Sequence, residues 1–384
     1  MILMWPDEKD HTILKLSCTV LIGASIFVFY GEFMYILKHV NEFDKLFYGL
    51  FMLVVPVLTI SKLPVVAYKC KELKHLLDMI SANFWPSDML DKTNNNSFNG
   101  LYKAGYVFMI IMFTTGQIFT IVIIVQPVFF SERTLPFPCV LPVDWSNTYM
   151  YIPIYIIHVI VMQLAVCLGV IGTDYLLLAI CIYTANQYYL LQRCFLVFNT
   201  SEMKEVNQEL TILSKDSMEQ YSNCLEKEYL LRCVKHHTML VRFTKDFNKT
   251  FNPLEIGQLI NSVWGVCLGT FILSRDDVSI YQTAAAIIYS SGFVMQLGID
   301  CVMGNEMWYQ ASLIPDCLFQ SNWKSLEKEE IKKDVLFILQ NTQRFPQFTA
   351  YGLYDMNMTS FIKVLKVAFS AYTFLTNVSN TQKK

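Results

Sequence analysis

The sequence predicts an all-α membrane protein with seven transmembrane helices, and three observations carry this prediction. Only 16% of the 384 residues are charged, 54% are hydrophobic, and the mean hydropathy is +0.37. Soluble proteins contain about 25% charged residues, so this chain has too little charge to cover a water-facing surface. The apolar residues form long runs, and a run of about 20 can span a bilayer. Lysine and arginine also divide unevenly between alternate loops, which indicates a fixed orientation.

The apolar runs predict the spans in order. The first, 13–37, is long enough for one membrane helix. The second, 46–60, is short but continues into a less apolar stretch, and we expect Pro56 and Pro64 to bend it. Membrane helices tolerate such prolines where neighbours satisfy the freed carbonyl groups. The remaining spans are expected at 106–130, 150–182, 256–274, 279–301 and 357–378.

Two polar segments, 183–255 and 302–356, are expected to form a cytoplasmic anchor that prolongs spans four to seven. The stretch LEKEYLLRCVKHHTMLVRF has helical periodicity, which predicts a water-facing helix joined to span five. The stretch SLEKEEIKKDVLFILQNTQ predicts a second charged helix, which Pro346 ends. No segment outside the spans is expected to fold alone, so residues 1–384 are interpreted as one domain.

Charge places the N-terminus in the cytoplasm and the C-terminus outside the cell. With that orientation the inner segments contain roughly 21 lysines and arginines and the outer ones roughly 6. The glycosylation triplets at Asn95, Asn199 and Asn248 point the other way, because they fall on the predicted inner side. Such triplets occur often by chance and need translocation to be used, so the charge bias outweighs them.

The sequence gives no indication of an enzyme, a metal site or a G-protein-coupled receptor. It contains no GxSxG, HExxH, P-loop or GxGxxG motif, and no cofactor is expected. His236 and His237 are adjacent on a helix, so their side chains diverge, and we expect them to be solvated rather than metal-bound. A net charge of −2 does not favour nucleic acid. The inverted orientation and the missing Asp-Arg-Tyr and Asn-Pro-x-x-Tyr motifs argue against a G-protein-coupled receptor.

The last span has a mixed face. In DMNMTSFIKVLKVAFSAYTFLTNV, the residues Lys363, Val367, Ser370, Phe374 and Asn377 lie on one side of a helix. A face that meets only lipid would be uniformly apolar. The mixture is typical of a wall that partly meets water, but packing between helices through polar side chains produces it too. The residues alone leave both interpretations open.

The approach to this span and the span itself resemble the signature of insect odorant receptors. The stretch FPQFTAYGLYDMNMTSFIKVLKVAFSAYTFL contains the Ala-x-Gly at Ala350 and Gly352 and closes on Ser-x-Tyr-Thr-Phe-Leu. The length, the seven helices, the long inner loop and the short C-terminal tail also resemble that family. The chain lacks the Gln-Phe ending of the gustatory relatives and differs from the longer co-receptor, so it resembles a ligand-tuned member.

The resemblance implies a function. Members form tetramers in which four last helices surround one pore, and a ligand-tuned subunit needs the odorant co-receptor as its partner in a heterotetramer. Binding of a small volatile ligand in the helical bundle opens the pore to cations in the plasma membrane of a sensory-neuron dendrite. Aligning the closing leucine at Leu375 puts Phe374 at the pore constriction and Asn377 at the outer mouth, with Ser370 on the same pore-lining face. A gustatory-type homotetrameric channel and a non-channel transporter remain as alternatives.

A ligand site for apolar volatiles needs an aromatic pocket with few polar groups. Aromatic residues gather in the predicted outer halves of the spans, and one continuous face of span four contributes several of them. An interfacial tyrosine belt is the alternative for the outermost, Tyr151 and Tyr281. Thr115 and Gln117 are possible polar partners. The predicted ligand-binding residues are Tyr48, Phe51, Phe119, Tyr151, Tyr155, His158, Met162, Tyr281 and Tyr289.

Overall fold

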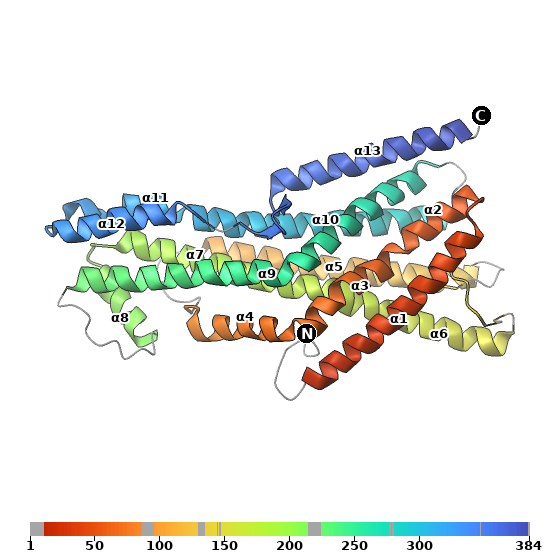
Figure 1. The fold of residues 1–384 in the computed structure, drawn as a ribbon, viewed down its shortest axis with the longest axis horizontal. Helices are drawn as coiled ribbons and strands as arrows, with labels where there is room; N and C mark the ends of the chain where they lie inside the picture. The colour runs from red at the N-terminus through yellow and green to blue at the C-terminus, as the bar shows by residue number, and fades with distance from the viewer. Residues whose placement is uncertain are drawn as a thin grey trace.

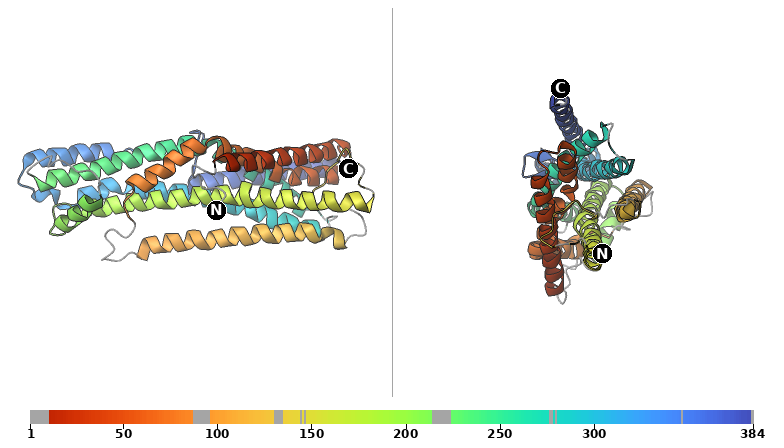
Figure 2. Two further views of the ribbon diagram at one scale, coloured as in Figure 1. Left: turned by 90° about the horizontal axis from the view of Figure 1, so that it is seen from below. Right: turned by 90° about the vertical axis from the view of Figure 1, so that its right-hand side faces the viewer.

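The protein is a long bundle of helices that run along a common axis (Figures 1 and 2). The computed structural model describes residues 11–86, 96–129, 135–143, 145, 147–213, 224–275, 278, 280–345 and 347–382. Pro346, the predicted end of a helix, lies outside these residues. The elements are α1 (His11–Lys38), α2 (Phe43–Met52), α3 (Val54–Tyr68), α4 (Cys70–Asn83), α5 (Asn96–Phe129), α6 (Thr148–Leu164), η2 (Ala165–Gly172), α7 (Thr173–Val197), α8 (Met203–Leu213), α9 (Leu225–Leu273), α10 (Ile280–Ser312), α11 (Ile314–Gln320), η3 (Asn322–Ser325), α12 (Glu329–Thr342), β1 (Thr349–Ala350), β2 (Tyr354–Asp355) and α13 (Met358–Gln382).

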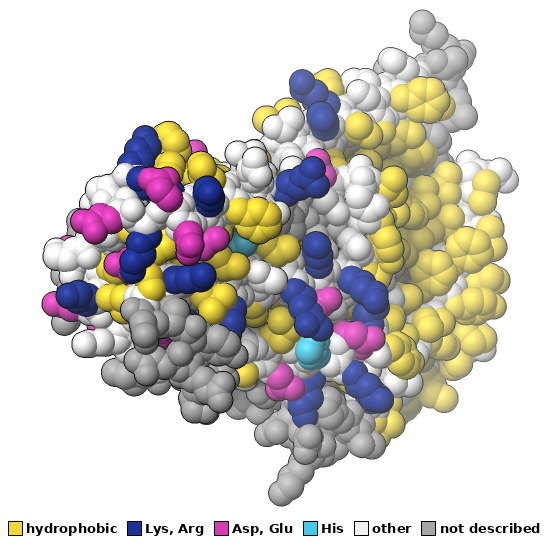
Figure 3. Space-filling model, turned by 60° about the vertical axis from the view of Figure 1, so that its left-hand side comes forward, with side chains coloured by type: hydrophobic (Ala, Val, Ile, Leu, Met, Phe, Trp, Pro, Cys, Tyr) yellow, Lys and Arg dark blue, Asp and Glu magenta, His cyan; other side chains and the backbone are white. Residues whose placement is uncertain are grey.

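The predicted all-α membrane fold is confirmed. Within the described residues, seven helical stretches are long and apolar enough to cross a bilayer: 15–38, 45–68, 102–125, 148–197, 225–273, 282–325 and 358–378. Several of them are much longer than a bilayer requires, because the helix continues past its apolar part. Figure 3 shows the consequence on the surface: charged side chains cover the near end of the molecule, and hydrophobic side chains cover the part behind it.

Prolines and one glycine-containing segment shape the membrane helices. Pro64 lies inside α3, and Pro253 lies inside the 49-residue helix α9, which changes direction part-way along its length (Figure 1). A proline inside a helix removes one backbone hydrogen bond and clashes with the preceding turn, which bends the helix. Between α6 and α7 the chain forms the π-helix η2, where Gly169 lets α3 approach closely. A Cβ at Gly169 would lie 2.8 Å from Thr59 Cγ2.

The end of the bundle far from residues 135–143 has its own core. Helices α7, α9 and α11 pack there around buried aromatic rings, among them Phe195, Phe243 and Phe247. The expectation that His236 is solvated is wrong, because its ring is buried and stacks on Trp85 with 3.6 Å between the centroids. The α9 helix joins this core to the membrane part without a break, so the two parts are mechanically continuous.

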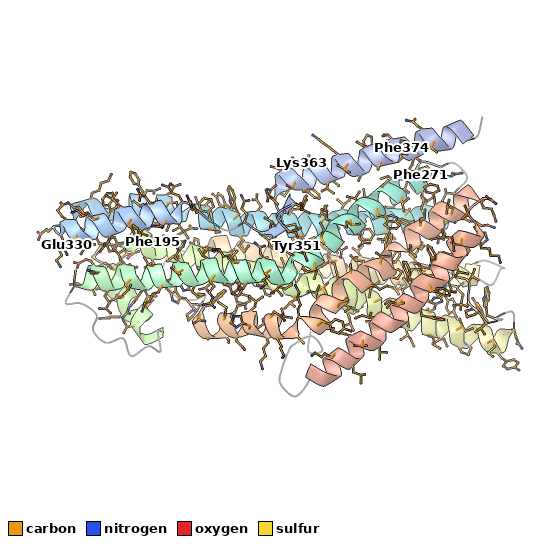
Figure 4. All side chains as sticks on the ribbon, viewed as in Figure 1. Phe195, Phe271, Glu330, Tyr351, Lys363 and Phe374 are labelled. Atoms are coloured by element: carbon orange, nitrogen blue, oxygen red, sulfur yellow. The ribbon has the colours of Figure 1, made fainter. Side chains whose placement is uncertain are left out.

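The last helix stands partly apart from the bundle (Figure 4). A two-stranded hairpin of β1 and β2 precedes α13 and turns at Gly352, whose φ of 69° is natural for glycine. The α13 helix packs on α9 and α10, and its buried side includes Val364 and Ala368. In Figure 4, Lys363 and Phe374 mark the course of this helix along the edge of the molecule.

Candidate functional site

An apolar cavity of about 70 Å³ lies inside the membrane part of the bundle. Four elements enclose it, α3, α5, η2 and α10, so residues far apart in the sequence form its wall. The residues that line it are Val55, Leu58, Met112, Thr115, Gly116, Phe119, Val166, Val170, Ile171, Ile288, Tyr289, Gly292, Phe293 and Gln296. Aliphatic and aromatic groups dominate this wall, and a few polar groups are placed among them, as is typical of small-molecule sites.

Aromatic rings fix one side of the cavity. Tyr289 stacks on Phe119 with 4.8 Å between centroids and an interplanar angle of 10°. Phe51 and Phe293 each meet the Tyr289 ring edge to face, also at 4.8 Å. Offset-stacked and edge-to-face pairs at this separation are favourable arrangements of aromatic rings. The four rings therefore hold one another in place, and the wall is preformed.

The predicted face of span four lies outside the cavity. Tyr155 on α6 donates its hydroxyl hydrogen bond to the Ile124 carbonyl at 2.7 Å, which ties α6 to α5. Tyr151 stacks obliquely on Tyr155, and His158 is buried with Nε2 3.9 Å from the sulfur of Cys139. Met162 is buried in the core that also contains Phe119. In the structure, this face packs against α5 and against the loop segment that contains Cys139.

The other predicted residues are placed as follows. Phe119 and Tyr289 line the cavity, and so does Thr115, whose hydroxyl donates to the Ile111 carbonyl at 2.7 Å. Phe51 supports the Tyr289 ring from behind. Tyr48 is partly buried against the same core. The side chain of Tyr281 lies outside the described part of the chain, and Gln117 accepts a hydrogen bond from Gln163 at 2.7 Å.

The sequence analysis does not predict two features of the site. The first is the contribution of glycines, because Gly116 and Gly292 line the cavity without filling it. The second is η2, which places Val166, Val170 and Ile171 on the wall. The pair of glycines inside strongly apolar spans is a signal for the first feature. The π-helix leaves no comparable pattern, although such segments are frequent at functional sites.

A network of buried charges lies beside the cavity. The Lys62 ammonium on α3 is fully buried and pairs with the Asp174 carboxylate on α7. Gln296 of the cavity wall donates to the same carboxylate at 2.6 Å. Glu255 and Asp300 are also buried, and among the described residues both Glu255 oxygens lack a hydrogen-bond partner. Ionisable groups at this depth are costly and mark functional sites by default.

Residues 135–143 form a loop segment that covers the bundle near His158. The Val140 N–H donates to the Gly31 carbonyl at 2.9 Å, and this contact holds the loop against α1. Cys139 is buried there, and burial raises the pKa of its thiol to about 12, with a smaller contribution from the negative charge of Glu32. The thiol is therefore protonated and unreactive at neutral pH.

The predicted pore-lining residues form the uncovered side of α13. Ser370, Phe374 and Asn377 are exposed, and 68% of Phe374 is accessible. Ser370 donates its hydroxyl back to the Lys366 carbonyl at 2.9 Å, so it satisfies itself within the helix. On this side a large apolar side chain, Phe374, therefore lies exposed beside polar residues within the described part of the chain.

Comparison with known proteins agrees with this architecture. The family model described as 7tm Odorant receptor matches residues 42–369. Similar curated proteins include Odorant receptor 13a and Odorant receptor 83a of Drosophila melanogaster, 22% and 23% identical over 65% and 67% of this chain. The matched stretches span 59% and 63% of those two proteins. Odorant receptor Or1 of Anopheles gambiae is 21% identical over 89% of this chain and 84% of its own length.

Solved structures show the same fold. The insect olfactory receptor OR5 from Machilis hrabei superposes with a TM-score of 0.79 at 11% identity, covering 97% of this chain and 92% of that one. Its complex with eugenol superposes with a TM-score of 0.78 over the same shares. The helices that enclose the cavity and the separate last helix therefore belong to a known architecture. Because the family model matches most of its length, this chain belongs to the odorant receptor family, a class of multi-pass membrane receptors rather than enzymes.

Proposed function

We propose that this chain is a ligand-tuned odorant receptor subunit, and that it binds small, mostly apolar volatile molecules in the cavity. The preformed aromatic wall is the observation that carries the proposal. A cavity needs about 10–15 Å³ to hold one water molecule, so a cavity of about 70 Å³ has room for a small organic group. The complex of the Machilis hrabei receptor with eugenol supports a ligand of this kind.

The proposal includes gating, and a path of contacts from the cavity to α13 supports it. Gln296 on α10 lines the cavity and belongs to the buried charge network. Slightly more than one helical turn further along α10, the Cys301 sulfur lies 3.3 Å from the Tyr354 hydroxyl. Tyr354 belongs to β2, directly before α13. A ligand that shifts α10 therefore acts on the start of the last helix.

The uncovered side of α13 supports a pore shared with other subunits. In the proposed assembly, four last helices face one another, and Ser370, Phe374 and Asn377 line the passage. Hydrophobic rings gate channels by excluding water, and polar side chains beyond them contact permeating ions. The proposed partners are odorant co-receptor subunits, and the proposed location is the plasma membrane of a sensory-neuron dendrite with the N-terminus inside.

Current recording tests the proposal. Cells that express the chain with the co-receptor are exposed to a panel of volatiles, beside cells that express either protein alone. We expect ligand-dependent cation current only when both are present. Strong current from the chain alone would favour a gustatory-type homotetramer, and ligand uptake without current would favour a transporter.

A further inference from the structure

The wall of the cavity is not equally buried on all sides. The residues of α3 that line it, Val55 and Leu58, are fully enclosed by the bundle. The lining residues that stay only half-buried lie mainly on two helices, α5 and α10, and include Met112, Thr115, Ile288 and Gly292. A residue that lines a cavity and is also accessible from outside marks a place where the cavity opens. The cavity therefore has a mouth at α5 and α10.

Contacts on the other side of α5 locate this mouth. A Cβ at Gly116 would lie 2.9 Å from Ile171 Cδ1, and the Gln117 amide oxygen accepts from Gln163 at 2.7 Å. This side of α5 therefore packs on α6 and η2. Successive residues of a helix point about 100° apart, so Thr115 lies at the opposite edge of the lining face from Gly116. That edge faces α10, which contacts α5.

A second hollow continues the gap between these helices. It has a volume of about 20 Å³ and shares Met112, Ile171 and Gln296 with the cavity. Further along it reaches Phe108 of α5 and Ile299 of α10. The two helices are thus loosely packed along a seam, and the side chain between the two hollows is a methionine. An unbranched methionine side chain has three rotatable bonds and adapts readily to what passes it.

The surface around the mouth is apolar. Ile111 and Ile118 of α5 are 42% and 52% exposed, and Ile287 of α10 is 53% exposed. Both helices contribute stretches that are long and apolar enough to cross a bilayer. Figure 2 shows α5, drawn in orange to yellow, along the edge of the bundle. Exposed aliphatic side chains on such helices are suited to lipid chains, so the mouth opens toward the interior of the bilayer rather than toward water.

We propose that the ligand enters the cavity laterally from the bilayer, through the mouth between α5 and α10. This route rests on the proposed function, because it needs the cavity to be the ligand site. An apolar molecule concentrates in lipid, by about 4-fold for each CH₂ group it contains. The receptor therefore samples its ligand at the concentration reached in the membrane, and molecules that dissolve well in lipid arrive fastest.

The test compares Ile111→Trp with Phe113→Trp. Both positions are on α5, they are 42% and 49% exposed, and neither is among the residues that line the cavity. Two residues are 200° apart on a helix, so only Ile111, one turn from Thr115, borders the mouth. The purified complex with the co-receptor, in phosphatidylcholine vesicles, is mixed rapidly with straight-chain alkyl acetates. The saturable change in protein fluorescence gives the rates of binding and release.

We expect Ile111→Trp to slow binding and release alike, by about 5- to 10-fold, because the larger ring obstructs the path in both directions. The dissociation constant stays at the wild-type value, since the bound ligand does not touch position 111. Phe113→Trp keeps the wild-type rates. In the wild type, at equal concentrations in water, the binding rate rises by about 4-fold for each CH₂ from propyl to hexyl acetate.

The outcomes separate the route from the site. If the acetates bind but Ile111→Trp keeps the wild-type rates, the lateral route is wrong. A binding rate that is the same for all chain lengths also overturns the route, because it means entry from water. If the wild type binds none of the acetates, the proposed ligand site is wrong, and the route is wrong with it.

Discussion

Gly292 shows how much a single residue contributes to the cavity. A Cβ built at this position would meet no atom within 4 Å, although the residue lies on the wall. Gly116 is different, because a Cβ there would lie 2.9 Å from Ile171 Cδ1 and press α5 against η2. Gly116 permits a close approach of helices, whereas Gly292 leaves space that a ligand can use.

We expect Gly292→Val to reduce ligand sensitivity by about 5- to 150-fold, because the added methyl groups occupy the space that the ligand needs. Larger ligands should lose most. The matched control is Gly23→Val on α1. A Cβ at Gly23 also meets no atom within 4 Å, but Gly23 does not line the cavity. Dose–response curves at equal surface expression measure the effect. Equal curves for Gly292→Val and the wild type would contradict a ligand in this cavity.

At the scale of single residues, the sequence predicts best those residues whose chemical type alone suggests a role. The gathering of aromatic residues in the predicted spans singles out Phe119 and Tyr289, and both residues line the cavity. Tyr155 and His158 share a helical face with each other, but periodicity does not say which neighbour that face meets. In the structure they meet Ile124 and Cys139. The prediction that they contact ligand stays a prediction.

At the scale of elements, the ion pair between Lys62 and Asp174 connects α3 to α7 inside the bundle, where the Lys62 side chain is fully buried and 12% of the Asp174 side chain is accessible. Removing one member of a buried ion pair leaves the other without its paired charge, which typically costs about 3–5 kcal/mol. We expect Asp174→Asn to lower both the unfolding temperature of the purified protein and its surface expression. The double variant Lys62→Met/Asp174→Asn should recover much of the loss, because it removes both charges of the pair together.

An exposed ion pair of the same chain provides the control. Lys332 and Glu329 are 2.8 Å apart, and 75% of the Glu329 side chain is accessible. Exposed pairs contribute little, so Lys332→Met should leave the unfolding temperature unchanged. If Asp174→Asn is as harmless as Lys332→Met, then the buried pair does not hold α3 and α7 together.

The two sides of α13 give a second prediction at this scale. Phe374→Ser should raise the basal current, because a polar residue admits water to a hydrophobic constriction. A cysteine at 374 or 377 should make the odorant current sensitive to thiol reagents applied from outside. A cysteine at Val364, on the buried side of the same helix, should be inert. Reagents that leave the current of all three variants untouched would contradict the pore assignment.

The sequence predicts the membrane helices better than it predicts the breaks and irregular segments between them. Long apolar runs specify where helices cross a membrane, since no other open structure satisfies the backbone there. The joint at Leu53 between α2 and α3, and the π-helix from Ala165 to Gly172, depend instead on neighbouring helices. Gly169 packs against Thr59 of α3. The sequence around Gly169 does not predict this contact, because the two residues are far apart in the chain.

For the whole molecule, the charge bias predicts a cytoplasmic N-terminus and an outer C-terminus. Two of the glycosylation triplets that point the other way have an asparagine side chain that is hydrogen-bonded in the folded chain. Asn199 Nδ2 donates to the Asn322 carbonyl at 2.8 Å, and Asn248 Nδ2 donates to the Gln347 carbonyl at 2.5 Å. N-glycosylation needs this nitrogen, so both triplets are poorly placed for it in the folded chain.

In cells with intact membranes, an epitope tag at the C-terminus should therefore be accessible to antibody, and a tag at the N-terminus should not. Permeabilising the membrane should expose both, which controls for the quality of the tags. Glycosidase treatment should not change the gel mobility of the protein through Asn199 or Asn248, because neither asparagine is expected to carry a glycan. Accessibility of the N-terminal tag alone in intact cells would reverse the predicted orientation.

The cavity and the uncovered side of α13 are built from different helices, and none of the residues that line the cavity belongs to α13. A mutation that reshapes the cavity thus leaves the surface available to other subunits as it was. On the proposed function, substitutions in the cavity can change which ligands are detected while the side of α13 that would face other subunits stays the same. If the proposed pore is right, ligand range and pore can therefore evolve separately.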